Sequence, residues 1–183
     1  MALTQSKFEL THGTVAPGFS LPDAYGNLHN LKDSLGKITI IVFWCNHCPY
    51  VKHLKTHFFE TARTKLSDCY IYLINSNDFI KYPEDNPEAM RADQEQFGYN
   101  IPYLVDETQV VAKAYHAACT PDFFILDQFH KVSYMGRYDG STPGNNQAVT
   151  GQDLLSAIEQ IRLGVIPKNQ KPAMGCNIKL QTQ

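Results

Sequence analysis

The segment Cys45-Asn46-His47-Cys48 brings together two cysteines and a histidine that could do chemistry. It directly follows an apolar run at residues 38–44, and a helical pattern follows it. If the chain passes here from strand to helix, we expect Cys45 at the helix N-terminus. There, unpaired N–H groups and the helix dipole favour a thiolate, which attacks disulfides and peroxides and binds metals. The same spacing forms half of a zinc site, so the motif alone leaves redox chemistry and metal binding open.

The elements on either side of the motif favour redox chemistry. Residues 38–44 are apolar and rich in β-branched side chains, which is typical of a central strand covered on both faces. After the motif, apolar residues recur at steps of three and four, at Val51, Leu54, Phe58, Ala62 and Leu66. Pro49 is tolerated only near the start of that helix, which again predicts the cysteines at its N-terminus.

The rest of the chain predicts an α/β fold with a mixed central sheet flanked by helices and an N-terminal hairpin extension. Short segments separated by Gly, Pro and Asn predict the hairpin before residue 38. Further strands are expected at 70–74, 102–105, 122–127 and 132–138. Helices are expected from Asn86 to about residue 97, at 108–117, and at 151–163 with Thr150 as the cap.

Composition describes an ordinary globular chain. Its 183 residues are 43% apolar and 19% charged, and we expect one domain over residues 1–183, with residues 165–183 as a tail on the surface. The formal net charge of −2, with scattered Lys and Arg, predicts neither nucleic acid nor an anionic membrane as a partner.

The cysteine count and the N-terminal segment suggest a compartment. Residues 1–10 contain no long apolar stretch typical of a secretory signal, and no run approaches the length needed to span a bilayer. Five cysteines, an odd number, fit a reducing environment in which thiols are catalytic or free. The sequence therefore predicts a cytoplasmic protein.

Several segments together resemble a known family. Residues 16–21 with Gly36-Lys37 resemble the opening of redoxin domains, and residues 43–51 resemble the active-site segment of a bacterial thioredoxin-like branch with a CNHC motif. Residues 119–127 resemble the segment that carries the family's cis-proline, and residues 175–179 recur in that branch. The chain is identified as a member of the thioredoxin-like redoxin family, which carries the alkyl hydroperoxide reductase/thiol-specific antioxidant (AhpC/TSA) domain.

This resemblance implies a thioredoxin-like fold and a site. Pro121 would be the cis-proline and would face the cysteine pair, and Thr120 could pair with an extended substrate chain. The family implies no cofactor and no resident metal.

The leading hypothesis is a thiol–disulfide oxidoreductase. Cys45 would attack a substrate disulfide as the thiolate, and Cys48 would resolve the mixed disulfide. Its partners would be protein or small-molecule disulfides and an upstream thiol reductant. The strand at 38–44 contains no acid, so proton transfer would need His47, a water or a distant carboxylate, for which Asp78 is the candidate.

A peroxiredoxin-like, antioxidant thiol peroxidase is the alternative. Such enzymes carry a Pro-x-x-x-Thr-x-x-Cys segment and a distant arginine. With Cys48 aligned to the reactive cysteine, Ile41 and Cys45 stand where proline and threonine belong. Arg137 is the nearest candidate for the arginine.

A Cu(I)- or Zn-binding carrier is the second alternative. Soft thiolates from Cys45 and Cys48 could bind these ions with His47, His53 or His57. Helical geometry places His57 too far from the cysteines to ligate the same ion.

The other cysteines receive different predictions. Cys119 lies two positions before Pro121 and is the candidate third redox thiol, with a small buried residue as its alternative. Cys69 is expected to be structural. Cys176 is expected either as a packed tail residue or as a mobile resolving thiol.

Overall fold

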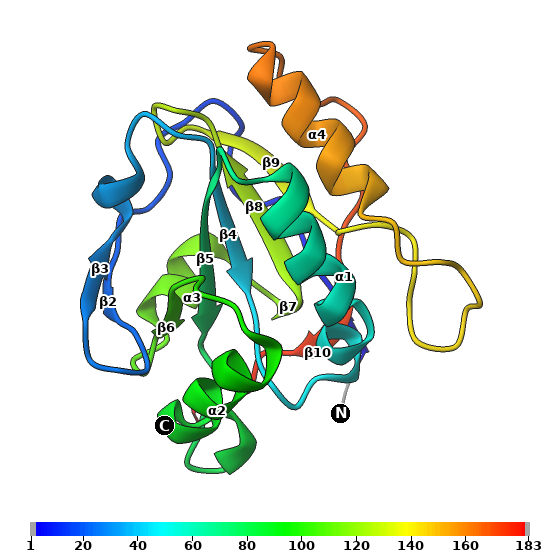
Figure 1. Ribbon diagram of the computed structural model, residues 1–183. Helices are drawn as coiled ribbons and strands as arrows, with labels where there is room; N and C mark the ends of the chain where they lie inside the picture. The colour runs from blue at the N-terminus through cyan, green and yellow to red at the C-terminus, as the bar shows by residue number, and fades with distance from the viewer. Residues whose placement is uncertain (1–2, 182–183) are drawn as a thin grey trace.

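The computed structural model describes residues 3–181 and shows a sheet with helices on both faces (Figure 1). Its strands are β1 (Leu3–Gln5), β2 (Ser20–Pro22), β3 (Leu28–Asn30), β4 (Thr39–Phe43), β5 (Tyr70–Asn75), β6 (Tyr103–Val105), β7 (Cys119–Thr120), β8 (Asp122–Leu126), β9 (Val132–Gly136) and β10 (Met174–Asn177). Its α-helices are α1 (Pro49–Lys65), α2 (Pro87–Phe97), α3 (Val110–Tyr115) and α4 (Gln152–Arg162), and short 3-10 turns lie at Leu31–Ser34 and Pro83–Asp85.

The central sheet is mixed, which confirms the predicted α/β class. Its strand order is β6-β5-β4-β8-β9. Strands β4, β5 and β6 run parallel, whereas β8 and β9 are antiparallel to their neighbours. Strand β4 lies in the middle, so the loop that follows it leaves from the centre of the sheet.

Alternating side chains of β4 explain why it is buried on both faces. Ile40 and Val42 pack in the apolar cluster that contains α1 and α4, while Ile41 and Phe43 pack in the cluster that contains α3. Successive side chains of a strand point to opposite faces, so a continuous apolar run suits a strand covered on both sides.

The N-terminal hairpin is present as predicted. Strands β2 and β3 form a two-stranded antiparallel sheet, with Leu21 opposite His29. A bridge between Asp23 and Leu104 joins this hairpin to β6 at the edge of the central sheet.

The observed ends of α2 agree with those predicted from the sequence, whereas the starts of α3 and α4 differ from the prediction. Asn86 caps α2 by accepting the N–H of Ala89 at 2.8 Å, and Gly98 ends that helix in the left-handed conformation, as predicted for 86–97. The α4 cap is Gly151 rather than Thr150, because the chain enters the helix through a left-handed residue (φ 66°). Helix α3 is shorter than the predicted 108–117 because it begins only after the left-handed Gln109.

The prediction of a surface tail over 165–183 is wrong for residues 173–179. Residues 174–177 form β10, which lies between β1 and β7 in a second, three-stranded sheet. Ala173, Cys176, Ile178 and Lys179 are buried. The tail pairs with strands distant in sequence, and its few apolar residues do not predict that pairing; the last positions of the predicted tail, 182–183, lie outside the described residues.

Within residues 3–181, none of the helices combines the length and apolar character required to span a bilayer.

Candidate active site

The cysteine motif lies in the loop between β4 and α1. Helix α1 begins at Pro49, and Cys48 is its N-cap, with φ −65° and ψ 123°. The expectation that Cys45 stands at the helix N-terminus is therefore wrong, because the loop takes up residues 44–47 before the helix starts. The unpaired N–H groups of the first turn surround Cys48 instead.

Thr120 contacts both thiols from the opposite side of the site. The Cys48 thiol donates to the Thr120 carbonyl oxygen at 3.1 Å, and the Cys45 Sγ lies 3.4 Å from the Thr120 hydroxyl. The Thr120–Pro121 bond is cis, as the resemblance implied. In the structure the strand partner of Thr120 is Cys176 of β10, whereas the sequence led us to expect a substrate chain there.

The two thiols have opposite acidities. A hydrogen bond from the Cys45 thiol, assisted by the Thr120 side chain and by the N–H groups of Val51 and Cys176, lowers the pKa of Cys48 to about 5. Burial, with further contributions from Cys48 and from the Asp85 carboxylate, raises the pKa of Cys45 well above its ordinary value. These two directions favour a thiolate on Cys48, whereas the sequence led us to expect one on Cys45.

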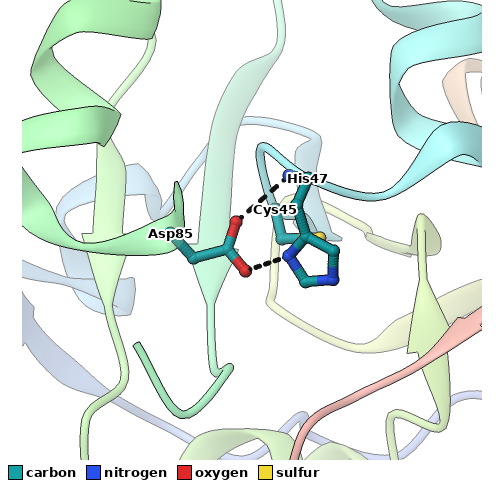
Figure 2. A group of neighbouring side chains, drawn as sticks. All are labelled: Cys45, His47 and Asp85. Carbon is teal, nitrogen blue, oxygen red and sulfur yellow. Dashed lines mark hydrogen bonds and ion pairs between the residues drawn. The ribbon is translucent and has the colours of Figure 1, made fainter. Parts of the chain in front are cut away.

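His47 is paired with a carboxylate that the sequence did not reveal. Its Nδ1 lies 2.5 Å from Asp85 Oδ2, and the N–H groups of Asn46 and His47 donate to Asp85 Oδ1 at 2.8 and 3.2 Å. Figure 2 shows the Asp85 carboxylate facing the loop and the imidazole, with the Cys45 side chain beside the ring. Asp85 is fully buried.

Further contacts hold this pair in place. Asn77 donates to Asp85 Oδ2 at 2.8 Å, and the Tyr82 ring stacks on His47 with centroids 5.3 Å apart. Burial acts to raise the pKa of Asp85, but hydrogen bonds from His47 and Asn77 outweigh it and keep that pKa below its usual value. Among the described residues, His47 Nε2 is buried without a hydrogen-bond partner.

The predicted acid, Asp78, has a different place. Its carboxylate accepts the N–H of Ile80 at 3.2 Å and lies 3.6 Å from the Lys81 ammonium. Asp85 occupies the position next to the cysteine loop instead. The only local signal for it is its place just before the α2 cap, because the contact joins residues almost forty positions apart.

A family model provides the decisive comparison. The model described as the AhpC/TSA family matches residues 12–135, well over half of the chain. The chain belongs to the AhpC/TSA family.

Two solved structures resemble this AhpC/TSA protein over almost their whole length. An uncharacterized conserved protein from Geobacillus kaustophilus has 42% identity and a TM-score of 0.94, covering 100% of this chain and 98% of its own. A hypothetical protein from Sinorhizobium meliloti 1021 has 39% identity and a TM-score of 0.93, covering 98% and 100%.

Curated relatives are more distant. Thiol-disulfide oxidoreductase ResA from Geobacillus thermodenitrificans is 29% identical over 127 residues, which make up 66% of this chain and 66% of the relative. The protein of that name from Bacillus subtilis is 27% identical, covering 72% of this chain and 70% of the relative. This AhpC/TSA protein thus spans about two thirds of the length of the relatives it matches. The thioredoxin domain of a Bacteroides vulgatus oxidoreductase, at 20% identity and a TM-score of 0.63, shares the thioredoxin-like fold and covers 84% of this chain and 99% of its own.

Arg137, the candidate for a peroxidase-type arginine, is paired with an acidic side chain. Arg137 donates to Asp153 at 2.6 Å. It lines a cavity of about 190 Å³ next to Pro121, but its charge is paired with that carboxylate.

Two of the three histidines considered as metal ligands point elsewhere. His53 bonds to Ser141 at 2.7 Å and His57 to Tyr138 at 2.8 Å. Cys45, His47 and Asp85 could hold a metal ion, since one ligand atom from each lies within 4.8 Å of the others. His47 and Asp85, however, bind each other through Nδ1 and Oδ2.

The remaining cysteines separate into two groups. Cys119 is buried, its thiol donates to the Pro121 carbonyl at 3.9 Å, and burial raises its pKa far above the ordinary value. Burial likewise raises the pKa of Cys69 to about 11. Cys176 differs, because both its thiol and its backbone N–H are hydrogen-bonded to the Cys48 sulfur.

Proposed function

We propose that this protein is a thiol–disulfide oxidoreductase that uses Cys45 and Cys48 as its dithiol/disulfide couple. The observation that carries this proposal is the shared contact of both cysteines with Thr120 at the start of α1, next to Pro121: Cys45 Sγ lies 3.4 Å from the Thr120 hydroxyl, and Cys48 Sγ lies 3.1 Å from its carbonyl oxygen. The printed names of the curated relatives, thiol-disulfide oxidoreductase, support the same chemistry.

The acidities reverse the order of roles expected from the sequence. The Cys48 thiolate attacks one sulfur of the substrate disulfide, forms a mixed disulfide and releases the first substrate thiolate. Cys45 then attacks the Cys48 sulfur, forms the Cys45–Cys48 disulfide and releases the second substrate thiolate. An upstream thiol reductant restores the dithiol.

The second step requires a base, because Cys45 is protonated at neutral pH. The His47 imidazole lies beside Cys45 and is oriented by Asp85. A carboxylate that accepts the Nδ1 proton of histidine makes the imidazole a better proton acceptor. His47 therefore takes the proton of Cys45, and Asp85 is its positioning residue.

Trapping the mixed disulfide tests the couple and its order. Reduced Cys45→Ser and Cys48→Ser proteins are mixed with a chromogenic aromatic disulfide, and the adduct is located by peptide mass spectrometry. We expect a stable adduct on Cys48 in Cys45→Ser, with one equivalent of aromatic thiol released. An adduct on Cys45 in Cys48→Ser, with none in the other variant, would restore the order expected from the sequence. Equal slow labelling of every cysteine in both variants would contradict the proposed function.

Hydrogen peroxide reduction is a second candidate, as an antioxidant activity of the same site. It is favoured by the Cys48 thiolate at the N-cap, the position from which peroxide could be attacked to give a sulfenic acid and hydroxide. The pairing of Arg137 with Asp153 engages the candidate for binding the peroxide oxygens with a competing carboxylate. We therefore expect the peroxide rate of wild type to fall well below its rate with disulfides, measured by stopped-flow under equal concentrations.

The substrate class follows from this chemistry, and the location remains a proposal. Disulfides of proteins or small molecules would be the substrates, and a reducing compartment, the cytoplasm, would supply the thiol reductant. Fractionation of the native host with an antibody against the protein would test the location.

A further inference from the structure

Strand β10 places a third cysteine at the active site. Cys176 lies directly opposite Thr120 in the register between β10 and β7, and opposite Leu3 of β1 on its other side. Its side chain is 4% exposed. Thr120 is the residue that contacts both active-site thiols. Cys176 is therefore the strand partner of the residue that touches the Cys45 and Cys48 sulfurs.

The approach of β10 to this site is unusually close. A Cβ atom on Gly175 would lie 2.0 Å from the Thr120 carbonyl oxygen, the atom that accepts the Cys48 thiol at 3.1 Å. Only glycine permits two backbones to come this near. The strand thereby brings both the N–H and the thiol of Cys176 into hydrogen-bond contact with the Cys48 sulfur.

We propose that Cys176 is a third redox thiol of this site and forms an alternative disulfide with Cys48. The inference rests on the proposed disulfide chemistry, and it assigns to Cys176 the part that the sequence had suggested for Cys119. The Cys119 thiol is engaged with the Pro121 carbonyl, whereas Cys176 faces the sulfur that reacts. Hydrogen-bonded sulfurs need to move by only about 2 Å to reach bonding distance.

The exchange balances without an external oxidant. When Cys45 and Cys48 are joined, the deprotonated Cys176 sulfur attacks the Cys48 sulfur. A Cys48–Cys176 bond forms, the Cys45–Cys48 bond breaks, and Cys45 leaves as a thiolate. The proton lost by Cys176 is passed to Cys45, so the site stays oxidised by two electrons, as one disulfide, while Cys45 becomes a thiol again.

One charged group assists this step. The Lys179 ammonium, held by the carbonyl and side-chain oxygens of Asn177 at 2.6 and 2.8 Å, favours a Cys176 thiolate. Burial and the neighbouring Cys48 thiolate oppose it. The opposition from Cys48 disappears once Cys48 is in a disulfide, so the Cys176 thiol loses its proton more readily in the oxidised state that it is to attack, although burial still opposes ionisation.

The test uses full-length Cys45→Ser protein equilibrated in glutathione redox buffers, then acid-quenched, alkylated and digested with trypsin. Residues 38–52 and 169–179 form the two expected peptides, and in this variant they carry only Cys48 and Cys176 as cysteines. We expect a disulfide-linked pair of these peptides under oxidising conditions, at least about tenfold more abundant than any other linked pair. Its formation does not depend on which thiol first attacks a substrate, so this measurement is separate from the trapping experiment.

Double variants provide the controls. Cys45→Ser/Cys119→Ala should retain the linked pair, and Cys45→Ser/Cys176→Ala should replace it with a glutathione adduct on Cys48. Circular dichroism establishes that each variant is folded, and Cys176→Ser is used if the alanine variant is not. A folded Cys45→Ser protein that carries only glutathione adducts, or that links Cys48 to Cys119, would overturn the assignment of Cys176. In that case a trapped adduct on Cys48 would still support the proposed function.

Discussion

The two ends of the cysteine loop provide opposite surroundings for the same chemical group. Cys48 caps α1 and receives hydrogen bonds from a thiol, a hydroxyl and two backbone N–H groups, so its pKa falls to about 5. Cys45 stands before the helix, fully buried and near the Asp85 carboxylate, so its pKa rises. The difference shows that the hydrogen bonds each sulfur receives, that of Cys45 to Cys48 first, and the burial of Cys45 favour ionisation of Cys48 over Cys45.

The largest effect should come from exchanging the two thiols for serine one at a time. Cys48→Ser removes the thiolate, and we expect the first release of aromatic thiol in a single turnover to slow by at least about 1,000-fold. Cys45→Ser should keep that first step within about tenfold of wild type and lose only the second release. Equal losses in both variants would mean that the two ends of the loop do not differ in function.

Asp85→Asn tests the base that serves Cys45. The amide keeps an oxygen that can accept the loop N–H groups. It lacks the negative charge that the carboxylate places next to His47 Nδ1. We expect the second release of thiol to slow by about 100-fold at neutral pH, with the first release nearly unchanged.

The matched control for this variant is Asp78→Asn. Asp78 lies in the same connection between β5 and α2, but it contacts Ile80 and Lys81 rather than the cysteine loop. Both release steps should stay within about twofold of wild type in this control. The ratio of the second release rate to the first should fall only in Asp85→Asn, which distinguishes a loss of proton transfer from a simple loss of structure.

Gly175→Ala should remove the hydrogen bond that the Cys176 N–H donates to the Cys48 sulfur. The new methyl group meets the Thr120 backbone at 2.0 Å, so β10 must move away and take the Cys176 N–H with it. We expect a loss of about 1–3 kcal/mol in the free energy of unfolding, measured by urea denaturation, together with a higher pKa of Cys48. Gly18→Ala is the control because no atom lies within 4 Å of its added methyl group. Unchanged stability in Gly175→Ala would contradict the close approach of β10.

The smallest expected change is a shift in the pKa of Cys48 when Cys45 is replaced. Alkylation of Cys48 in reduced wild type should reach half its maximal rate near pH 5, since its pKa is about 5. Cys45→Ala removes the principal donor and should move this midpoint upward, whereas Cys45→Ser keeps a hydroxyl donor and should move it less. Identical midpoints in all three proteins would exclude the Cys45 hydrogen bond as the cause.

The same titration predicts how stability depends on pH. The folded pKa of Cys48, about 5, lies below the ordinary value of 9.0, so its contribution is fully present above pH 9 and is lost as the pH falls toward 5. Relative to Cys48→Ala, the reduced protein should therefore gain stability as the pH rises through this window in chemical denaturation. The oxidised Cys45–Cys48 form has no thiolate and should show no such gain.

Local patterns predicted the elements that carry the site. The apolar run before the motif, the helical spacing after it and the Asn86 cap correspond to β4, α1 and α2. Each of these signals lies within a few residues of the structure that it specifies. Asp85 and Cys176 could not be assigned in the same way, because each meets the cysteine loop only after distant segments pack together.

By itself, the sequence determined that a dithiol motif connects a buried strand to a helix, whereas the place of Thr120–Pro121 at the same site was implied by the resemblance to the redoxin family. Strand and helix periodicity and the chemistry of proline are local properties, so neighbouring residues suffice to define them. Only the tertiary structure decided that the surroundings of Cys48 lower its pKa, that Asp85 binds His47, and that Cys176 rather than Cys119 is hydrogen-bonded to Cys48. Those outcomes depend on burial and on donors supplied from β7, β10 and the turn before α2, and such contacts exist only once the chain has folded.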